Sequence, residues 1–383
     1  MTGSGSLLVP GSPRMFWPGE PCDDEETRPP AATLVGNGPD PRGPAVELFA
    51  RRLAEAVEAA DAPDVVLAVS RHGRRTVMSG GTAGRRALPR EALRYEVGSA
   101  GKTFTGLLLA RLIQRGAVTG GEPAAMLLDA TRPPGAHPVT LAHLITHTSG
   151  LPALPPGFLR RALPAWHTNP YARFPAELVV RAFLRHRPRH RPGTRWCYSN
   201  YGVAVLGHAL AATTGTPWEK LLAEQVLHPL GLTGTTLHAD GPGLDAPGHD
   251  KDGRTPVPAF DAGGFQAAGA LRSTPGDLLT FLEAHLDPAS AQGTSPTLAA
   301  ALRAVRRPVL RRGLTHRHVH TIAWFRHPTD GGPMYFHSGA TLGQQAFLGF
   351  RPDTGTALAA VCTRRFRPHD PFVARAYALL AEA

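Results

Sequence analysis

Hydrophobic residues recur at two different spacings along the chain, and each spacing predicts one type of element. The segment 46–60 is apolar at helical spacing, and it is followed by a short apolar run at 64–70 that is typical of a buried strand. A turn at 71–75 then leads into a second predicted strand at 76–79. We therefore expect the folded part of the chain to begin with a helix and two neighbouring strands.

Strand patterns return in the C-terminal third of the chain and end in a helix. Because such patterns occur near both ends, we expect the two ends to share one antiparallel sheet that is covered by the first and last helices. The predicted strands lie at 319–325, 334–338, 344–350 and 356–362, a hairpin turn lies at 352–355, and the final helix lies at 372–380.

The section between these regions consists of helical patterns and loops that are rich in proline and glycine. The predicted fold class is therefore α+β, with a sheet subdomain formed by residues 45–104 and 266–383 and an inserted, mainly helical subdomain formed by residues 105–265. Residues 1–44 are rich in glycine, proline, serine and acidic side chains, and we expect them to form a disordered tail.

Composition limits the class of protein further. At 383 residues, of which 42% are hydrophobic, the chain can bury a large core. No apolar stretch approaches the roughly 20 residues of a membrane span. The N-terminal region lacks the basic head and apolar middle of a secretory signal. We therefore expect a cytoplasmic protein without a membrane partner, and this expectation disfavours a role in cell-wall synthesis or antibiotic defence.

The formal net charge of +11 raises the question of a nucleic-acid partner. Arginine clusters occur at 185–191 and 306–312, but they contain prolines and lack the interleaved aromatic residues of a base-stacking platform. We interpret them as solvated basic loops and expect no nucleic-acid partner, while a weak role in steering anionic substrates stays open.

Cysteine and histidine give no sign of a disulfide framework or a metal site. The three cysteines are odd in number and scattered. His143 and His147 have the spacing of a zinc-binding helix, but a zinc protease would need glutamate where Leu144 stands, and no third ligand is evident. We expect neither a metal nor a cofactor.

Candidate chemistry begins with Ser99 and Lys102, just before a predicted helix at 104–113. Residues three apart lie one above the other on a helix, so the hydroxyl and the amine can come within hydrogen-bond distance. A serine is a poor nucleophile until a group takes its proton, and a partly desolvated lysine can take it or hold a second base. Lysine is rare here, with only Lys102, Lys220 and Lys251, so this spacing is less prone to chance than usual.

The same segment also resembles the end of a phosphate-binding P-loop. That pattern, Gly-x-x-x-x-Gly-Lys-[Ser/Thr], needs a glycine where Glu96 stands, and an acidic side chain there would face phosphate. The preceding segment 94–97 is also too short, and too mixed in polar and apolar residues, for a buried parallel strand. The sequence therefore disfavours nucleotide binding.

Two further groups follow in Tyr198-Ser199-Asn200, which lies after a turn-rich stretch and before an apolar helix predicted at 203–212. Tyr198 could accept the serine proton if a nearby cation lowers the pKa of its phenol. Asn200 could position a substrate carbonyl or hold the lysine. The alternative is that Tyr198 is a core aromatic residue and Asn200 a helix cap.

A third group, His337-Ser338-Gly339-Ala340, lies between two predicted strands. Gly339 carries no side chain, so a ligand could approach the backbone there. The N–H of Ala340, together with that of Ser99, could form an oxyanion hole. The alternative is a hairpin edge with a surface histidine.

Taken together, the three groups resemble the serine β-lactamase and penicillin-binding-protein superfamily, in particular its class C β-lactamase-like branch, which includes esterases, D-amino-peptide hydrolases and some acyltransferases. The resemblance covers roughly residues 45–383, including the segments 144–152, 229–232 and 268–274. It implies the β-lactamase-like fold. It also assigns site roles: Ser99 is similar to the nucleophile, Lys102 to the activating lysine, Tyr198 to the general base or acid, and Asn200 to the substrate-positioning residue.

His337 departs from the family pattern, because β-lactamases and many carboxypeptidases have a lysine at this position. A largely neutral imidazole binds a substrate carboxylate poorly near pH 7. We therefore expect a serine hydrolase that forms an acyl-enzyme at Ser99 with an ester or amide from a small-molecule or peptide acyl substrate. Alternatives are an acyltransferase or peptide-cyclising enzyme of secondary metabolism, and a non-catalytic homologue that binds a ligand.

Overall fold

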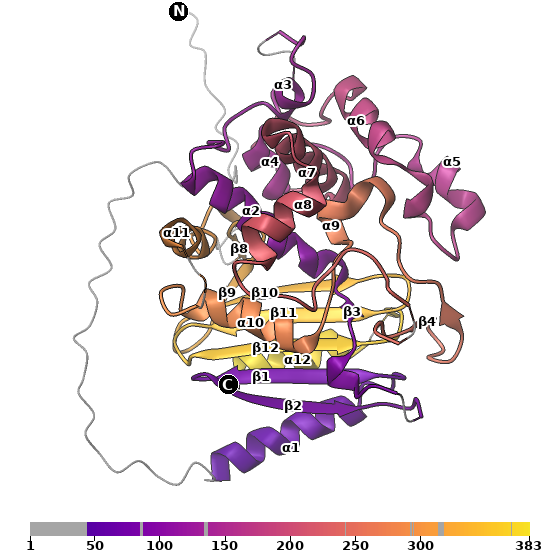
Figure 1. Ribbon diagram of the computed structural model, residues 1–383, viewed down its shortest axis with the longest axis vertical. Coiled ribbons are helices and arrows are strands. Elements are labelled where there is room, and N and C mark those ends of the chain that lie inside the picture. The colour runs from indigo at the N-terminus through magenta and orange to yellow at the C-terminus, as the bar shows by residue number, and fades with distance from the viewer. Residues whose placement is uncertain are drawn as a thin grey trace, which may run out of the picture.

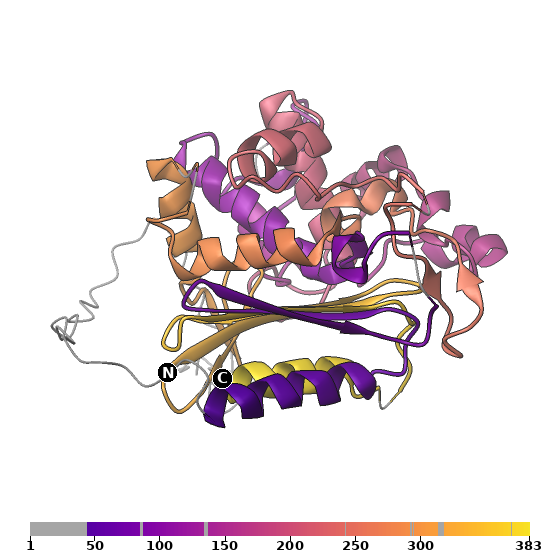
Figure 2. The same cartoon turned by 60° about the horizontal axis from the view of Figure 1, so that its bottom comes forward.

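The computed structural model describes residues 44–84, 87–133, 137–241, 243–291, 293, 295–312, 318–368 and 370–383. The tail expected at residues 1–44 lies outside this part, except for Pro44. In the described part, a large sheet lies between two layers of helices, and a group of further helices sits over one side of it (Figures 1 and 2).

Within the described residues, the main sheet has eight strands in the order β2-β1-β12-β11-β10-β9-β8-β7, and the neighbouring strands run antiparallel. Strand β1 pairs with β12 from Val65 opposite Cys362 to Arg71 opposite Thr356, so the two chain ends share one sheet as predicted. The strands are β1 (Val65–Arg71), β2 (Arg74–Gly80), β7 (Leu310–Arg312), β8 (His318–His320), β9 (Phe325–Pro328), β10 (Pro333–Ala340), β11 (Gln345–Arg351) and β12 (Thr356–Cys362).

Helices cover both faces of this sheet. The first and last helices, α1 (Pro44–Glu58) and α12 (Phe372–Ala381), lie side by side on one face, as the sequence predicted (Figure 2). Helices α2 (Lys102–Gln114), α10 (Pro275–Leu286) and α11 (Pro296–Ala304) lie on the other. Because both faces are covered, every residue of β11 and β12 is buried, which explains their nearly continuous apolar sequences.

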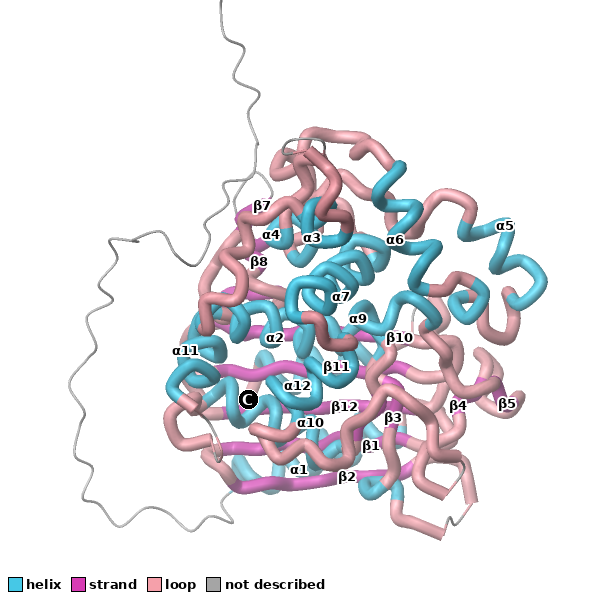
Figure 3. The backbone as a smooth tube through the Cα atoms, turned by 45° about the horizontal axis from the view of Figure 1, so that its top comes forward, coloured by secondary structure: helices cyan, strands magenta, loops and turns pink. Residues whose placement is uncertain are grey.

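Most of the remaining helices come from the middle of the chain and gather around α7 (Figure 3). Two pairs of very short strands lie outside the main sheet, β3 (Tyr95–Glu96) with β6 (Arg272–Ser273) and β4 (Gly248–His249) with β5 (Pro256–Val257). The helices are α3 (Ala124–Leu128), α4 (Leu141–Ile145), α5 (Phe158–Ala162), α6 (Ala176–Arg185), α7 (Asn200–Thr214), α8 (Trp218–Leu222), which continues as a π-helical turn at Ala223–Leu227, and α9 (Gln266–Gly269).

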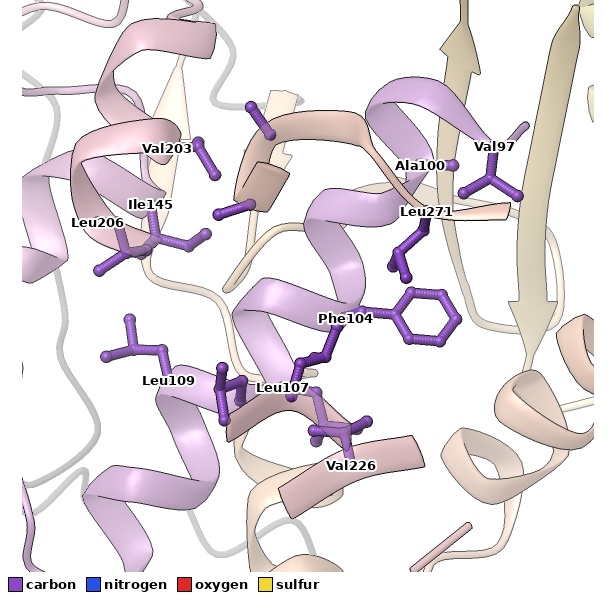
Figure 4. Packing of buried hydrophobic residues seen from close by; sticks show 14 of the residues in the cluster. Val97, Ala100, Phe104, Leu107, Leu109, Ile145, Val203, Leu206, Val226 and Leu271 are labelled. Carbon is purple, nitrogen blue, oxygen red and sulfur yellow. The ribbon is translucent and has the colours of Figure 1, made fainter. Parts of the chain in front are cut away.

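Helix α2 connects the sheet to the helical part and is buried along almost its whole length. A helix that is hydrophobic on all sides belongs in a core. Figure 4 shows Phe104 and Leu107 of α2 among apolar side chains from other elements, such as Leu271 and Val226. Each fully buried side chain of this size contributes roughly 1.5–3 kcal/mol, so the packing fixes the start of α2 firmly.

The structure differs from the sequence prediction near β8. The single strand predicted at 319–325 is two strands, β8 and β9, separated by a turn in which Ala323 has a φ of 66°. Helix α11 and strand β7 were not predicted. Among the described residues, no helix has both the length and the apolar character needed to cross a bilayer.

Candidate active site

Ser99 lies in a 3₁₀ turn, Gly98–Gly101, that leads directly into α2. Side chains three residues apart eclipse one another in a 3₁₀ helix. The Nζ atom of Lys102 is accordingly 2.9 Å from the Oγ atom of Ser99, and it donates a second hydrogen bond to the backbone oxygen of Ala268 at 2.6 Å. The predicted pairing of hydroxyl and amine is therefore present.

Lys102 has an unusual protonation equilibrium, because only 1% of the residue is exposed. Burial disfavours the ammonium form and lowers the pKa of Lys102 from 10.5 to about 7. Near neutral pH, a large share of the molecules therefore carries a neutral amine next to Ser99, and such an amine can accept a proton.

Tyr198 lies two residues before α7 and is hydrogen-bonded to Ser99. The Nζ atom of Lys102 is 5.1 Å from the centre of the Tyr198 ring. Tyr198 was predicted to accept the serine proton only if a nearby cation lowers the pKa of its phenol, but burial raises this pKa to about 12. Because the phenol stays protonated near neutral pH, Tyr198 can relay a proton but is not a phenolate base in the resting protein.

Asn200 is the first residue of α7 and lines the same cavity as Ser99. Its Nδ2 group donates to the hydroxyl of Tyr171 at 3.3 Å. Its buried Oδ1 atom has no hydrogen-bond partner among the described residues. The cap of α7 is Ser199, whose Oγ atom accepts from the N–H of Gly202 at 2.8 Å. The alternative interpretation of Asn200 as the helix cap is thus wrong.

Strand β10 brings Gly339 and Ala340 against the turn that holds Ser99. A Cβ atom on Gly339 would lie 2.0 Å from the backbone oxygen of Val97 and 2.7 Å from the backbone nitrogen of Ser99. Only glycine allows this approach. A Cβ atom on Gly98 would similarly lie 2.8 Å from the nitrogen of Ala340. Ser99 and Ala340 therefore line one wall of the same cavity.

His337 lies on the same strand but is not one of the residues that line the cavity. It is 3% exposed, its Nδ1 atom bonds to the backbone oxygen of Ser338 at 2.7 Å, and its ring packs against Phe325. Burial, assisted by the positive charge of Lys102, lowers the pKa of His337 to about 3. Its ring is therefore neutral at pH 7.

The cavity at Ser99 has a volume of about 190 Å³. The residues that line it carry no ionisable acid or base apart from the phenol of Tyr171. Five of its lining residues were not predicted, because they lie in loops and short 3₁₀ turns without a recognisable motif: Tyr171, Phe260, Phe265, Thr341 and Leu342. The lining residues are Gly98, Ser99, Tyr171, Asn200, Phe260, Phe265, Ala268, Gly269, Ala340, Thr341 and Leu342.

The model of the Beta-lactamase family matches residues 49–383 of this chain. The chain belongs to the Beta-lactamase family. Among curated proteins, a β-lactamase of Pseudomonas fluorescens is 29% identical over 202 residues, which cover 51% of this chain and 51% of that protein. The D-alanyl-D-alanine-carboxypeptidase/endopeptidase AmpH of Escherichia coli (strain K12) is 29% identical over 204 residues, covering 50% and 48%. The chain thus spans about half the length of these relatives.

Solved structures show the same fold. A class C β-lactamase from Rhodobacter sphaeroides has a TM-score of 0.71 at 22% identity, covering 87% of this chain and 97% of that one. A β-lactamase/D-alanine carboxypeptidase from Pseudomonas syringae has a TM-score of 0.73 at 19% identity, covering 88% and 98%. The predicted α+β, class C β-lactamase-like fold and the predicted superfamily are therefore confirmed.

A buried ion pair holds two walls of the cavity together. Glu96, just before the Ser99 turn, accepts from Arg272 at 3.2 Å, and only 6% and 3% of the two side chains are exposed. Glu96 also accepts from the backbone N–H of Phe260 at 2.7 Å and from the hydroxyl of Thr341 at 2.5 Å. The acidic residue that argued against a P-loop thus faces inward and ties both walls to the nucleophile turn.

Within the described ranges, no three His, Cys, Asp or Glu side chains lie close enough to hold a metal ion. A larger hollow of about 1010 Å³ lies between the β1–β2 turn and α10, where Arg75 forms an ion pair with Glu283. It contains none of the candidate residues.

Proposed function

We propose that this protein is a serine hydrolase that forms an acyl-enzyme at Ser99 with an uncharged ester or amide. The observation that carries the proposal is the environment of Lys102. A fully buried amine, with a pKa of about 7, lies 2.9 Å from a serine hydroxyl that opens into a cavity. A buried lysine has a cost in stability, and a perturbed pKa in a cleft is a common mark of catalysis.

The reaction begins with transfer of the Ser99 proton to the neutral amine of Lys102, directly or through the hydroxyl of Tyr198. The Oγ atom then bonds to the substrate carbonyl carbon, whose oxygen takes the negative charge. The N–H groups of Ser99 and Ala340 stabilise that charge, and such a donor commonly contributes about 2.7–4 kcal/mol. As the intermediate collapses, the leaving group takes the proton back from Lys102.

Water then repeats the sequence on the acyl-enzyme. It gives a proton to Lys102, bonds to the acyl carbon, and releases the acid as Ser99 regains its proton. Lys102 and Tyr198 therefore serve both half-reactions. The group that accepts a proton in one step donates it in the next.

The cavity supports a substrate class as well as a mechanism. Its aromatic and aliphatic walls include Phe260, Phe265 and Leu342, and it provides no cation for a carboxylate. His337, where the family pattern has a lysine, is neutral and buried. A volume of about 190 Å³ is below the usual range for drug-sized ligands, roughly 300–1,000 Å³. We therefore favour a short, uncharged acyl group over a β-lactam or a peptide with a free C-terminal carboxylate.

Two chromogenic substrates test this proposal. We expect p-nitrophenyl acetate to be hydrolysed with a higher kcat/KM than a chromogenic cephalosporin. Ser99→Ala should lower ester turnover by more than about 10³-fold. Ser79→Ala is the matched control, because this hydroxyl lies on the exposed strand β2 and bonds to Glu91. Equal turnover in wild type and Ser99→Ala would remove Ser99 from the mechanism, and faster cleavage of the cephalosporin would overturn the substrate class.

A further inference from the structure

His147 lies in the tight turn after α4, directly beside the segment that carries Tyr198. Its φ of 59° lies in the left-handed region, which few residues with side chains adopt. A conformation of this kind is unfavourable for a residue with a side chain and persists only where surrounding contacts impose it. The turn is closed by a hydrogen bond from the N–H of Thr148 to the backbone oxygen of His143 at 2.9 Å.

This conformation lets one residue hold the chain on both sides of Tyr198. The N–H of Cys197 donates to the backbone oxygen of His147 at 2.8 Å. The N–H of Ser199 donates to the Nδ1 atom of the His147 ring at 3.2 Å. The ring itself lies 4.5 Å from the Tyr198 ring, centre to centre. Tyr198 is thus held before, after and beside its own position by a single histidine.

The protonation state of His147 suits this arrangement. The residue is 6% exposed, and burial lowers its pKa well below the usual value, with further lowering by nearby Lys102, His337, His320 and Arg312. The ring is therefore neutral near pH 7. A neutral imidazole has one nitrogen with a free lone pair, and here Nδ1 uses it to accept the N–H of Ser199.

We propose that His147 is a positioning residue that holds the hydroxyl of Tyr198 against Ser99. This role rests on the proposed function, because it acts through Tyr198. His147 does not line the cavity and so does not touch the substrate. It is expected to affect the rate of acylation and to leave substrate binding nearly unchanged.

Two substitutions separate the hydrogen bond from the backbone conformation. Glycine adopts positive φ freely but has no side-chain acceptor. Asparagine also tolerates this region, and its Oδ1 atom can take the place of Nδ1. Both remove the ring. We expect His147→Gly to lower kcat for p-nitrophenyl acetate by about 10–100-fold, since a shift of about 1 Å in a reacting group costs about 10². His147→Asn should stay within about threefold of wild type, and KM should change less than about twofold in both.

Labelling of Ser99 by a fluorophosphonate, followed until slow variants react, gives a second measurement. If wild type is not labelled, the proposed function fails, and this role with it. If wild type is labelled and His147→Gly is labelled at the same rate, the positioning role alone is overturned. The same holds if the labelling rates of His147→Gly and His147→Asn fall by the same factor. In a Tyr198→Phe background, His147→Gly should have almost no further effect, and a full additional loss would show that it does not act through Tyr198. His143→Asn is the control, because the His143 ring accepts from the N–H of Thr140 at the start of α4 and makes no hydrogen bond to the Tyr198 segment among those of the described residues.

Discussion

Replacing Lys102 by methionine should change how the stability of the protein depends on pH. The wild-type amine has a pKa of about 7 in the folded protein against an ordinary value of 10.5. Between these values the unfolded chain holds a proton that the folded protein has released. The free energy of unfolding of the wild type should therefore rise with pH across this window, because stability rises wherever the unfolded state binds more protons.

The magnitude follows from the size of the pKa change. A fall from 10.5 to about 7 covers about 3.5 pH units, and each unit corresponds to about 1.4 kcal/mol. Relative to Lys102→Met, the wild type should gain about 1.4 kcal/mol of stability per pH unit above pH 7, and about 5 kcal/mol over the whole window. Below pH 7 both states of the wild type are protonated, so the difference from the variant should be constant.

Urea unfolding followed by tryptophan fluorescence, between about pH 6 and 10, measures this difference. Taking wild type minus variant cancels the other groups that titrate in the same range. Lys220→Met is the control, because the Lys220 side chain is 68% exposed and pairs only loosely with Glu224 at 3.8 Å. For Lys220→Met, the free energy of unfolding plotted against pH should run parallel to that of the wild type up to pH 9. A Lys102→Met curve that is also parallel would refute the buried, nearly neutral amine.

Three further outcomes are expected. The rate of Ser99 labelling should rise with pH through about 7, as Lys102 loses its proton, and then level off; a rate that does not vary from pH 5 to 9 would contradict this. Gly339→Ala should reduce labelling by at least about 10², because the new Cβ would lie 2.7 Å from the nitrogen of Ser99, whereas Gly276→Ala, where the nearest atom is 3.9 Å away, should not. Glu96→Gln leaves a buried arginine without its counter-charge and should cost about 3–5 kcal/mol in urea unfolding; a loss under about 1 kcal/mol would disprove the importance of this pair.

Sequence patterns predicted the strands well where the element depends on residues close together along the chain. The strand predicted at 356–362 is β12, Thr356–Cys362, because a continuous apolar run follows a turn in which Gly355 has a φ of 58°. The break between β8 and β9 was missed because alanine has no preference for the left-handed conformation that Ala323 adopts. The turn is closed locally by the N–H of Thr321, which donates to the backbone oxygen of Trp324 at 2.9 Å.

The same distinction separates the predicted and the missed parts of the site. Ser99 and Lys102 are neighbours along the chain, so their spacing alone predicts their contact. Several cavity walls come from segments that are distant along the chain, such as those of Tyr171 and Phe260, whose rings meet at 5.5 Å only in the folded protein. The sequence left open whether a nearby cation lowers the pKa of the Tyr198 phenol. Burial raises this pKa instead, and a motif does not reveal burial.

The central claim is that Ser99 becomes covalently acylated with the help of Lys102, and intact-protein mass spectrometry after a fluorophosphonate pulse tests it most directly. We predict a single adduct on the wild type, located by peptide mapping at Ser99, no adduct on Ser99→Ala, and a much slower one on Lys102→Ala. An adduct at another residue, or equal labelling of all three proteins, would contradict the account.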